Sequence, residues 1–284
     1  MTYAHHYKPT AVHAEGVLDP ASREFYIHTL SLLKDAKLDF MLGGAYAFAQ
    51  YTGIERHTKD LDIFVRPTDA QRTLEILAGA GYDTELTFSH WLGKAHCGDD
   101  FVDVIFSSGN GACPVDDSWF THAEQSDVFG VPVLLMPPEE MIWQKSLILE
   151  RERYDGADVA HILHCRAEHL DWTRLLTRFE AHWRVLLSHL ILFGFIYPSE
   201  RDRVPAAVLQ DLLERLRQEH DSAAPVEKIC RGTILSRQQY LTDVRAWGYS
   251  DARVTNGHMN HREVQQWTAA IETSLRQQEE PESV

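Results

Sequence analysis

The stretch from Asp60 to Val65 places two carboxylates on what reads as a buried strand. In Asp-Leu-Asp-Ile-Phe-Val the acidic residues are two apart, and every other residue is apolar. Because side chains alternate across a strand, Asp60 and Asp62 must leave by the same face. Two like charges side by side on an apolar strand are unfavourable unless a positive group lies between them. The sequence therefore predicts a fold that brings a cation to this strand.

The segment before this strand is suited to an anionic ligand. Residues 38–42 read as a strand that stops at Gly43 and Gly44, and residues 45–53 read as a short helix closed by Gly53. The two glycines allow a sharp turn and a close approach of the backbone to a ligand. The free N–H groups at the start of the helix suit a phosphate.

A third carboxylate follows on another apolar strand. The sequence around Gly98 reads as a hairpin whose second strand, residues 101–106, carries Asp103. A lone aspartate on an edge strand is a plain alternative, and Asp99 and Asp100 read as turn residues. With Asp103 added to the first pair, the pattern favours hard-oxygen ligands for Mg²⁺ or Mn²⁺, as in a two-metal site.

The remaining pattern divides the chain into an α/β part and a helical part. Asp19 and Pro20 open a helix, Thr68 and Gln71 suggest a capping box for the next, and residues 129–136 read as a strand. After Pro137 helical periodicity prevails. The predicted organisation is an N-terminal arm at 1–18, an α/β (α+β) domain with a short mixed sheet at 19–138, an all-helical domain at 139–275 and an acidic, disordered tail at 276–284.

Composition narrows the classes of partner. The formal net charge is −15, from 27 basic and 42 acidic side chains, which disfavours an extended nucleic-acid surface but leaves room for a tRNA end in a local basic cleft. The four cysteines include no zinc-type pair, and no stretch approaches the ~20 apolar residues of a membrane helix. We therefore expect a cytoplasmic protein without a membrane partner.

The glycines and aspartates together resemble a known superfamily. Leu-Gly-Gly at 42–44, Asp-Leu-Asp at 60–62 and Val-Asp-Val at 102–104 look like the motifs of the DNA polymerase β-like nucleotidyltransferases. The resemblance implies the nucleotidyltransferase fold, with Gly43 and Gly44 contacting a nucleoside triphosphate. It also implies that Asp60 and Asp62 bind metal, while Asp103 assists metal binding and deprotonates the acceptor hydroxyl.

A second group of residues narrows the resemblance. The pattern Arg-x-Thr-x-Asp-x-Asp, from Arg56 and Thr58, is similar to the bacterial branch that contains abortive-infection toxins of the AbiEii type. That branch carries a downstream lysine, arginines and an aspartate pair, which here match Lys145, Arg151, Arg153, Asp155 and Asp158. The resemblance implies triphosphate contacts for Lys145 and the arginines, and we also expect Arg56 and Thr58 to bind the nucleotide. A toxin role would require an antitoxin-like partner. The position of Arg56 just before the metal strand also suits a phosphate.

Simpler readings exist for these downstream residues. Lys145 could extend along an apolar helix face, at least one arginine could pair with Glu150 or Glu152, and Asp155 could cap a helix. The basic and aromatic stretch at 230–253 could contact an acceptor or form a capping subdomain.

The pattern as a whole predicts a Mg²⁺-dependent nucleotidyltransferase. It would transfer a nucleoside monophosphate from a nucleoside triphosphate to a hydroxyl acceptor and release pyrophosphate. The acceptor could be a small molecule, an RNA end or a protein. The alternative is a catalytically silent, nucleotide-binding regulatory module.

Overall fold

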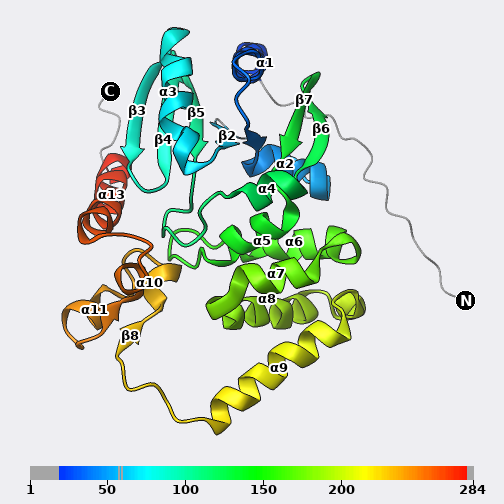
Figure 1. The fold of residues 1–284 in the computed structure, drawn as a ribbon, viewed down its shortest axis with the longest axis vertical. Coiled ribbons are helices and arrows are strands. Elements are labelled where there is room, and N and C mark those ends of the chain that lie inside the picture. Colours follow the sequence, from blue (N-terminus) through cyan, green and yellow to red (C-terminus); the bar gives the residue numbers. More distant parts are fainter. Residues whose placement is uncertain (1–18, 57, 59, 280–284) are drawn as a thin grey trace, which may run out of the picture.

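A seven-stranded mixed sheet forms the centre of the N-terminal part in the computed structural model (Figure 1). The structure describes residues 19–56, 58 and 60–279, with side chains to residue 270. The strand order is β3-β4-β5-β2-β1-β7-β6, in which β2 pairs with β5 and β1 with β7 in parallel, and the other pairs are antiparallel. The strands are β1 (Met41–Leu42), β2 (Asp60–Phe64), β3 (Asp83–Phe88), β4 (Leu92–Cys97), β5 (Asp100–Ile105), β6 (Glu124–Val128) and β7 (Val131–Leu135).

Helices flank the sheet and make up most of the C-terminal part, so the predicted fold class is confirmed. A short parallel pair, β8 (Ile229–Cys230) and β9 (Ser250–Asp251), interrupts the expected all-helical region. The helices are α1 (Pro20–Asp35), α2 (Gly44–Thr52), α3 (Ala70–Gly79), α4 (Asp117–His122), α5 (Pro138–Ser146), α6 (Gly156–Arg166), α7 (Trp172–Phe179), α8 (Trp183–Ile196), α9 (Ala206–Asp221), α10 (Gly232–Leu235), α11 (Leu241–Arg245), α12 (Ala252–Thr255) and α13 (His261–Glu279). The 3₁₀ helices are η2 (Pro67–Asp69), η3 (Ala167–His169), η4 (Glu180–His182) and η5 (Pro198–Arg203).

The predicted ends of α1 and α2 are confirmed. The carboxylate of Asp19 accepts hydrogen bonds from the first backbone N–H groups of α1, and Gly53 ends α2 in the left-handed region at φ +70°. The predicted capping box of Thr68 and Gln71 is wrong. Thr68 lies inside η2, so it lacks the extended backbone that a helix cap requires, and the Gln71 side chain donates to Glu75 instead.

Two strands escaped the sequence pattern, and two are shorter than predicted. The expected strand at 38–42 is reduced to β1, and that at 129–136 to β7. The unpredicted strands β3 and β6 lie at the two edges of the sheet, and most of their side chains are exposed or half-buried. Edge strands of this kind carry little of the apolar alternation by which strands are recognised.

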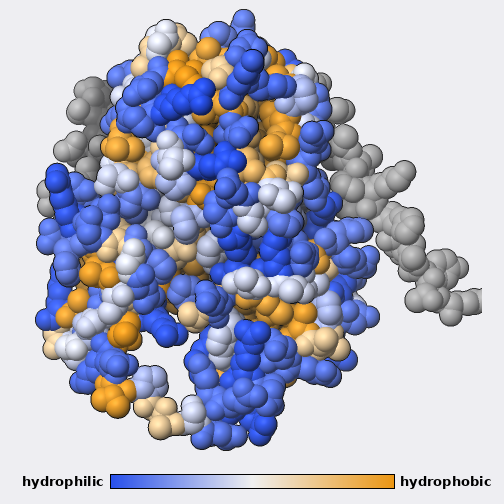
Figure 2. Space-filling view, viewed as in Figure 1, coloured by the Kyte–Doolittle hydropathy of each residue, from blue (hydrophilic) through white to orange (hydrophobic). Residues whose placement is uncertain are grey.

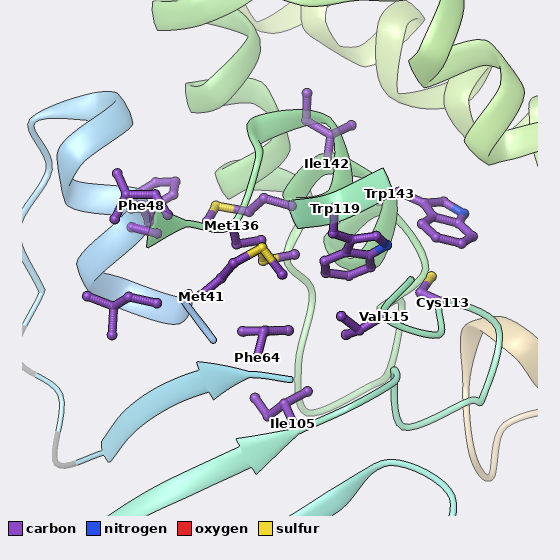
Figure 3. Close-up of a cluster of buried hydrophobic side chains, with 14 of the residues drawn as sticks. Met41, Phe48, Phe64, Ile105, Cys113, Val115, Trp119, Met136, Ile142 and Trp143 are labelled. Carbon is purple, nitrogen blue, oxygen red and sulfur yellow. The ribbon is translucent and has the colours of Figure 1, made fainter. Parts of the chain in front are cut away.

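The core beneath the acidic strands is packed by large apolar side chains (Figure 3). Phe64 at the end of β2 and Ile105 at the end of β5 lie near Met136, which follows β7. Trp119 of α4 stacks on Phe64 with 5.9 Å between the ring centroids, and Ile142 of α5 is fully buried. This packing fixes the ends of β2 and β5 beside α5, which leads to the helical part.

The C-terminal segment returns to the sheet after a long excursion. Helix α9 is followed by an exposed stretch at 222–228, which leads to β8 and spans the opening at the bottom of Figure 2. From β8 onward the chain turns back, and α13 lies beside β3. The predicted N-terminal arm at 1–18 and residues 280–284 lie outside the described residues. Helix α13 continues to Glu279, so residues 276–279 of the tail expected to be disordered are helical.

One apolar helical stretch is longer than the sequence reading anticipated. The run from Trp172 to Ile196 is long and apolar enough to cross a membrane by length and composition alone. It comprises α7, η4 and α8, and α8 packs against α5, α6, α7 and α9. Core helices of globular domains share this composition.

Candidate active site

Three carboxylates meet where β2 and β5 run side by side. In the parallel register Asp62 is paired with Asp103, and Asp60 lies two residues before Asp62 on the same face. One carboxylate oxygen from each residue can be chosen so that all lie within 4.8 Å of one another, and all three residues are half-buried. The structure thus brings the predicted acidic trio together. Oxygen ligands at this spacing can hold a divalent cation.

The electrostatics of the trio favour a bound cation. Burial raises the pKa of Asp62 to about 7, and the neighbouring charges of Asp60 and Asp103 add to the increase. Lys145 and Arg153 act in the opposite direction without cancelling it. Burial also raises the pKa of Asp103 above its ordinary value. Burial and mutual repulsion thus make the ionised trio unfavourable by itself, and a bound cation would offset both effects.

Lys94 is a site residue that the sequence reading missed. In the antiparallel register of β4 and β5 it lies opposite Asp103, and its Nζ is 2.5 Å from Asp103 Oδ1. This cation lowers the pKa of Asp103 but does not overcome the effect of burial. The sequence did contain the information needed to find it. A hairpin that turns at residues 98 and 99 must pair residue 94 with residue 103, which is the observed register.

The glycine pair makes room for the acidic strand. A Cβ on Gly44, whose φ is +53°, would lie 1.7 Å from Asp62 Oδ2, and a Cβ on Gly43 would lie 2.1 Å from the ring of Phe64. The Gly43 N–H also donates to the Asp62 carbonyl at 2.9 Å. The glycines thus let the start of α2 pass directly against β2, so the positive end of the helix dipole lies beside the Asp62 carboxylate.

Thr58 and Arg56 contact other side chains. The Thr58 hydroxyl donates to the carboxylate of Asp60. The Arg56 guanidinium lies 4.6 Å from the centre of the Phe48 ring and 2.5 Å from Asp158 Oδ1. Neither residue lines the cavity described below, whereas Gly44 does.

Lys145 lies in a chain of alternating charges. Its Nζ is 3.1 Å from Asp155 Oδ2 and 2.6 Å from Asp158 Oδ2, while Arg153 donates two hydrogen bonds of 2.9 Å to Asp155. Burial favours the neutral form of Asp155, but these hydrogen bonds and charges outweigh it and hold its pKa below the ordinary value. The two aspartates therefore fix both cations at the edge of the site.

The structure bears on three expectations about this segment. Arg153 pairs with Asp155 and not with Glu150 or Glu152, since Glu150 binds Arg237. Asp155 occupies the N-cap position of α6, as the simpler reading expected, but its side chain makes no capping hydrogen bond there. Of the two arginines, Arg153 lines the cavity, and Arg151 is exposed and lies outside its lining. The structure thus favours Arg153 over Arg151 for contact with a ligand there.

A cavity of about 270 Å³ adjoins the trio. Its lining includes the three aspartates, Gly44, Lys145 and Arg153 from the N-terminal side, together with apolar residues of the core such as Phe64. Its other wall comes from far along the chain, with residues 233–237 and Trp267. The segment at 230–253 was expected to contact an acceptor or to form a capping subdomain. Of its residues, 233–237 lie at the cavity. That placement depends on tertiary contacts that the sequence pattern does not encode.

Comparisons with known proteins give distant structural likenesses. No protein-family model matches the chain, and neither does any curated protein. Among solved structures, the lincosamide antibiotic adenylyltransferase LnuA, bound to lincomycin, is 17% identical over 49% of this chain and 94% of its own, with a TM-score of 0.36. The antibiotic-resistance factor ANT(2'')-Ia is 17% identical over 72% and 99%, with a TM-score of 0.34.

Two further solved structures are similar at the same level. An antigenic nucleotidyltransferase-like protein from Paracoccidioides brasiliensis is 13% identical over 66% of this chain and 96% of its own, with a TM-score of 0.45. A putative nucleotidyltransferase from H. pylori is 15% identical over 93% and 100%, with a TM-score of 0.33. All four TM-scores are below 0.5, a level of likeness that does not define what this chain does.

Proposed function

We propose that the protein is a metal-dependent nucleotidyltransferase that transfers a nucleoside monophosphate to a hydroxyl acceptor and releases pyrophosphate. The observation that carries the proposal is the trio of Asp60, Asp62 and Asp103, whose oxygens converge within 4.8 Å beside the start of α2. Cations at Lys145 and Arg153 line the same cavity. Phosphoryl transfer needs this combination of metal ligands and positive groups around a polyphosphate.

The trio fits a divalent metal such as Mg²⁺ or Mn²⁺. Its donors are hard carboxylate oxygens, and burial together with the charges of Asp60 and Asp103 makes the ionised form of Asp62 costly without a cation, as its raised pKa indicates. We assign metal binding to Asp60 and Asp62, and the negative charge of Asp103 beside them adds to the attraction for the cation. A metal held there would supply Lewis-acid stabilisation of the phosphates. Thr58 would orient the Asp60 carboxylate through its hydroxyl.

The chain's own residues would then carry the remaining steps. Asp103 takes the proton of the acceptor hydroxyl through the oxygen that Lys94 leaves free, which suits a carboxylate of raised pKa. The acceptor oxygen forms a bond to the α-phosphorus, the bond from that phosphorus to the bridging oxygen breaks, and pyrophosphate leaves with the electron pair. Lys145, Arg153 and the start of α2 neutralise charge on the leaving group.

A second candidate is the regulatory module that binds nucleotide without chemistry. The ion pair of Lys94 with Asp103 favours it, because the pair occupies one oxygen of the proposed base. The resemblance to the toxin branch supports the enzyme and would add an antitoxin-like partner. The two candidates differ in one measurable respect, which is the transfer of label from the nucleotide.

The test is label transfer from nucleoside triphosphates radiolabelled at the α-phosphate. Each is incubated with Mg²⁺, the purified protein and cell extract separated into RNA, protein and small-molecule fractions. Asp62→Asn removes a metal ligand, and Asp99→Asn, exposed in the turn between β4 and β5, is the matched control. Label that enters one fraction with the wild type and Asp99→Asn, but not with Asp62→Asn, supports the enzyme. Nucleotide binding without any transfer favours the regulatory module.

A further inference from the structure

The order of the strands separates two sides of the site. Asp103 lies on β5, and beyond it comes β4, whereas Gly44 lies at the opposite side, where β1 pairs with β2. Lys145 and Arg153 belong with the second side, because they are held by residues at the start of α6, which packs against α2. If the phosphates occupy that side and Asp103 is the base, the acceptor must approach from the side of β4 and β5.

The wall on that side is built jointly by the sheet and the loops that follow its strands, the loop after α5 and the C-terminal segment. We call it the acceptor wall, and it consists of Trp91, Ser107–Asn110, Glu150, Thr233–Arg237 and Trp267. These parts are fastened together, since Asn110 Nδ2 donates to the Ile234 carbonyl at 2.7 Å and the Leu149 N–H donates to the Leu235 carbonyl at 3.0 Å. The rings of Trp91 and Trp267 meet edge to face, with 5.1 Å between their centroids.

The two charged residues of the acceptor wall, Glu150 and Arg237, neutralise each other. Arg237 Nη2 donates to Glu150 Oε2 at 2.7 Å, and its Nε donates to Oε1 at 2.8 Å. The backbone N–H of Arg237 also donates to this carboxylate, and the guanidinium lies 4.2 Å from the centre of the Trp267 ring. The Glu150 carboxylate is therefore paired through both of its oxygens, and the ion pair as a whole carries no net charge. A ligand on this wall therefore meets aromatic and aliphatic surface and neutral polar groups.

We propose that the acceptor wall binds a small, electrically neutral hydroxyl compound with an apolar or ring-shaped face, an inference that rests on the proposed function. A polycationic acceptor would need unpaired carboxylates on the wall, and a nucleic acid would need unpaired basic groups. The described residues of the wall offer neither. The cavity of about 270 Å³, which the triphosphate would share, lies just below the usual range for small-molecule pockets, so the room along the wall suits a small acceptor.

The test divides the small molecules of a cell extract by charge. Ion-exchange resins at neutral pH give a cation-retained, an anion-retained and an unretained neutral fraction, and the RNA and protein fractions complete the set. Each is incubated with the full-length protein, Mg²⁺ and α-labelled nucleoside triphosphates. We expect labelled product from the neutral fraction. Absence of product from that fraction overturns the inference, whichever other fraction is labelled.

Two leucine variants connect the result to the wall. Leu235→Glu places an unpaired carboxylate on the wall, and we expect it to lower transfer to the neutral acceptor by at least about tenfold, because desolvating an unpaired charge is costly. Leu213→Glu makes the same change on the exposed surface of α9 and should leave transfer unchanged. Equal transfer by Leu235→Glu and the wild type contradicts the inference.

Nucleotide binding separates this inference from the proposed function. Retention of labelled nucleoside triphosphate on filters is measured for the wild type and both leucine variants. If the wild type binds no nucleotide in the presence of Mg²⁺, the proposed function fails. If the wild type binds and Leu235→Glu does not, the wall holds the base of the nucleotide and the acceptor inference alone is overturned.

Discussion

Replacing Asp62 by asparagine should make the metal-free protein more stable at alkaline pH. Burial and the charges of Asp60 and Asp103 raise the pKa of Asp62 to about 7 from the ordinary 3.8. A carboxylate whose pKa is raised in the folded state costs stability when it is ionised. The cost is nearly absent at pH 4, grows as the pH rises through the interval between the two pKa values, and is complete above pH 7.

The size of the effect follows from the shift. About three pKa units at 1.36 kcal/mol each correspond to about 4 kcal/mol of unfolding free energy. Asp62→Asn abolishes this ionisation. Between pH 4 and pH 8 its free energy of unfolding should therefore rise by about 2–4 kcal/mol relative to that of the wild type. The lower figure allows for solvent that reaches the half-buried carboxylate. The same substitution removes a proposed metal ligand, so it should gain stability while losing activity.

The assay is denaturant unfolding in EDTA at pH 4, 6 and 8, followed by far-ultraviolet circular dichroism. Asp99→Asn provides the matched control and should track the wild type at every pH. Adding Mg²⁺ at pH 8 should stabilise the wild type and not Asp62→Asn. A stability difference between Asp62→Asn and the wild type that is the same at pH 4 and pH 8 would refute the reasoning. So would a loss of stability at pH 8.

Three further substitutions probe the surroundings of the trio. Gly44→Ala should cost at least about 2 kcal/mol of unfolding free energy and abolish transfer, because its Cβ meets the Asp62 carboxylate. Gly98→Ala, also at positive φ but in open space, should cost about 1 kcal/mol and leave transfer intact. Denaturation and label transfer check both variants. Lys145→Met should weaken filter binding of nucleoside triphosphate by about tenfold or more, and Arg151→Met should not change it. Lys94→Met removes the cation that lowers the pKa of the proposed base, so the acidic limb of the rate–pH profile should move to higher pH; an unmoved limb excludes Asp103 as that base.

The acidic centre could be predicted from the sequence because its signal is local. Asp60 and Asp62 share a face by the two-residue period of a strand, and Asp103 interrupts a second apolar strand in the same way. Their convergence then requires only that the two strands be neighbours. The glycine pair was recognised too, and the structure adds that its lack of side chains makes room for Asp62 and Phe64.

The rest of the site depends on contacts between distant segments. Arg151 and Arg153 lie in the loop between α5 and α6, where Arg153 lines the cavity and Arg151 does not. Helical periodicity cannot place side chains of a loop. The partner of Glu150 is Arg237, 87 residues away in the sequence. Pairings over such separations follow from the packing of the whole chain, and no short pattern announces them.

The exposed connection at 222–228 has an evolutionary consequence. The aspartates, Lys145 and Arg153 all come before it in the chain. The segment after it supplies residues 233–237 and Trp267 of the acceptor wall. Insertions, deletions and substitutions after the connection can reshape that wall while leaving the carboxylates, the glycine turn and Lys145 untouched. Under the proposed function, related chains can diversify in what they modify by changing the segment that follows the connection, while the chemistry stays the same.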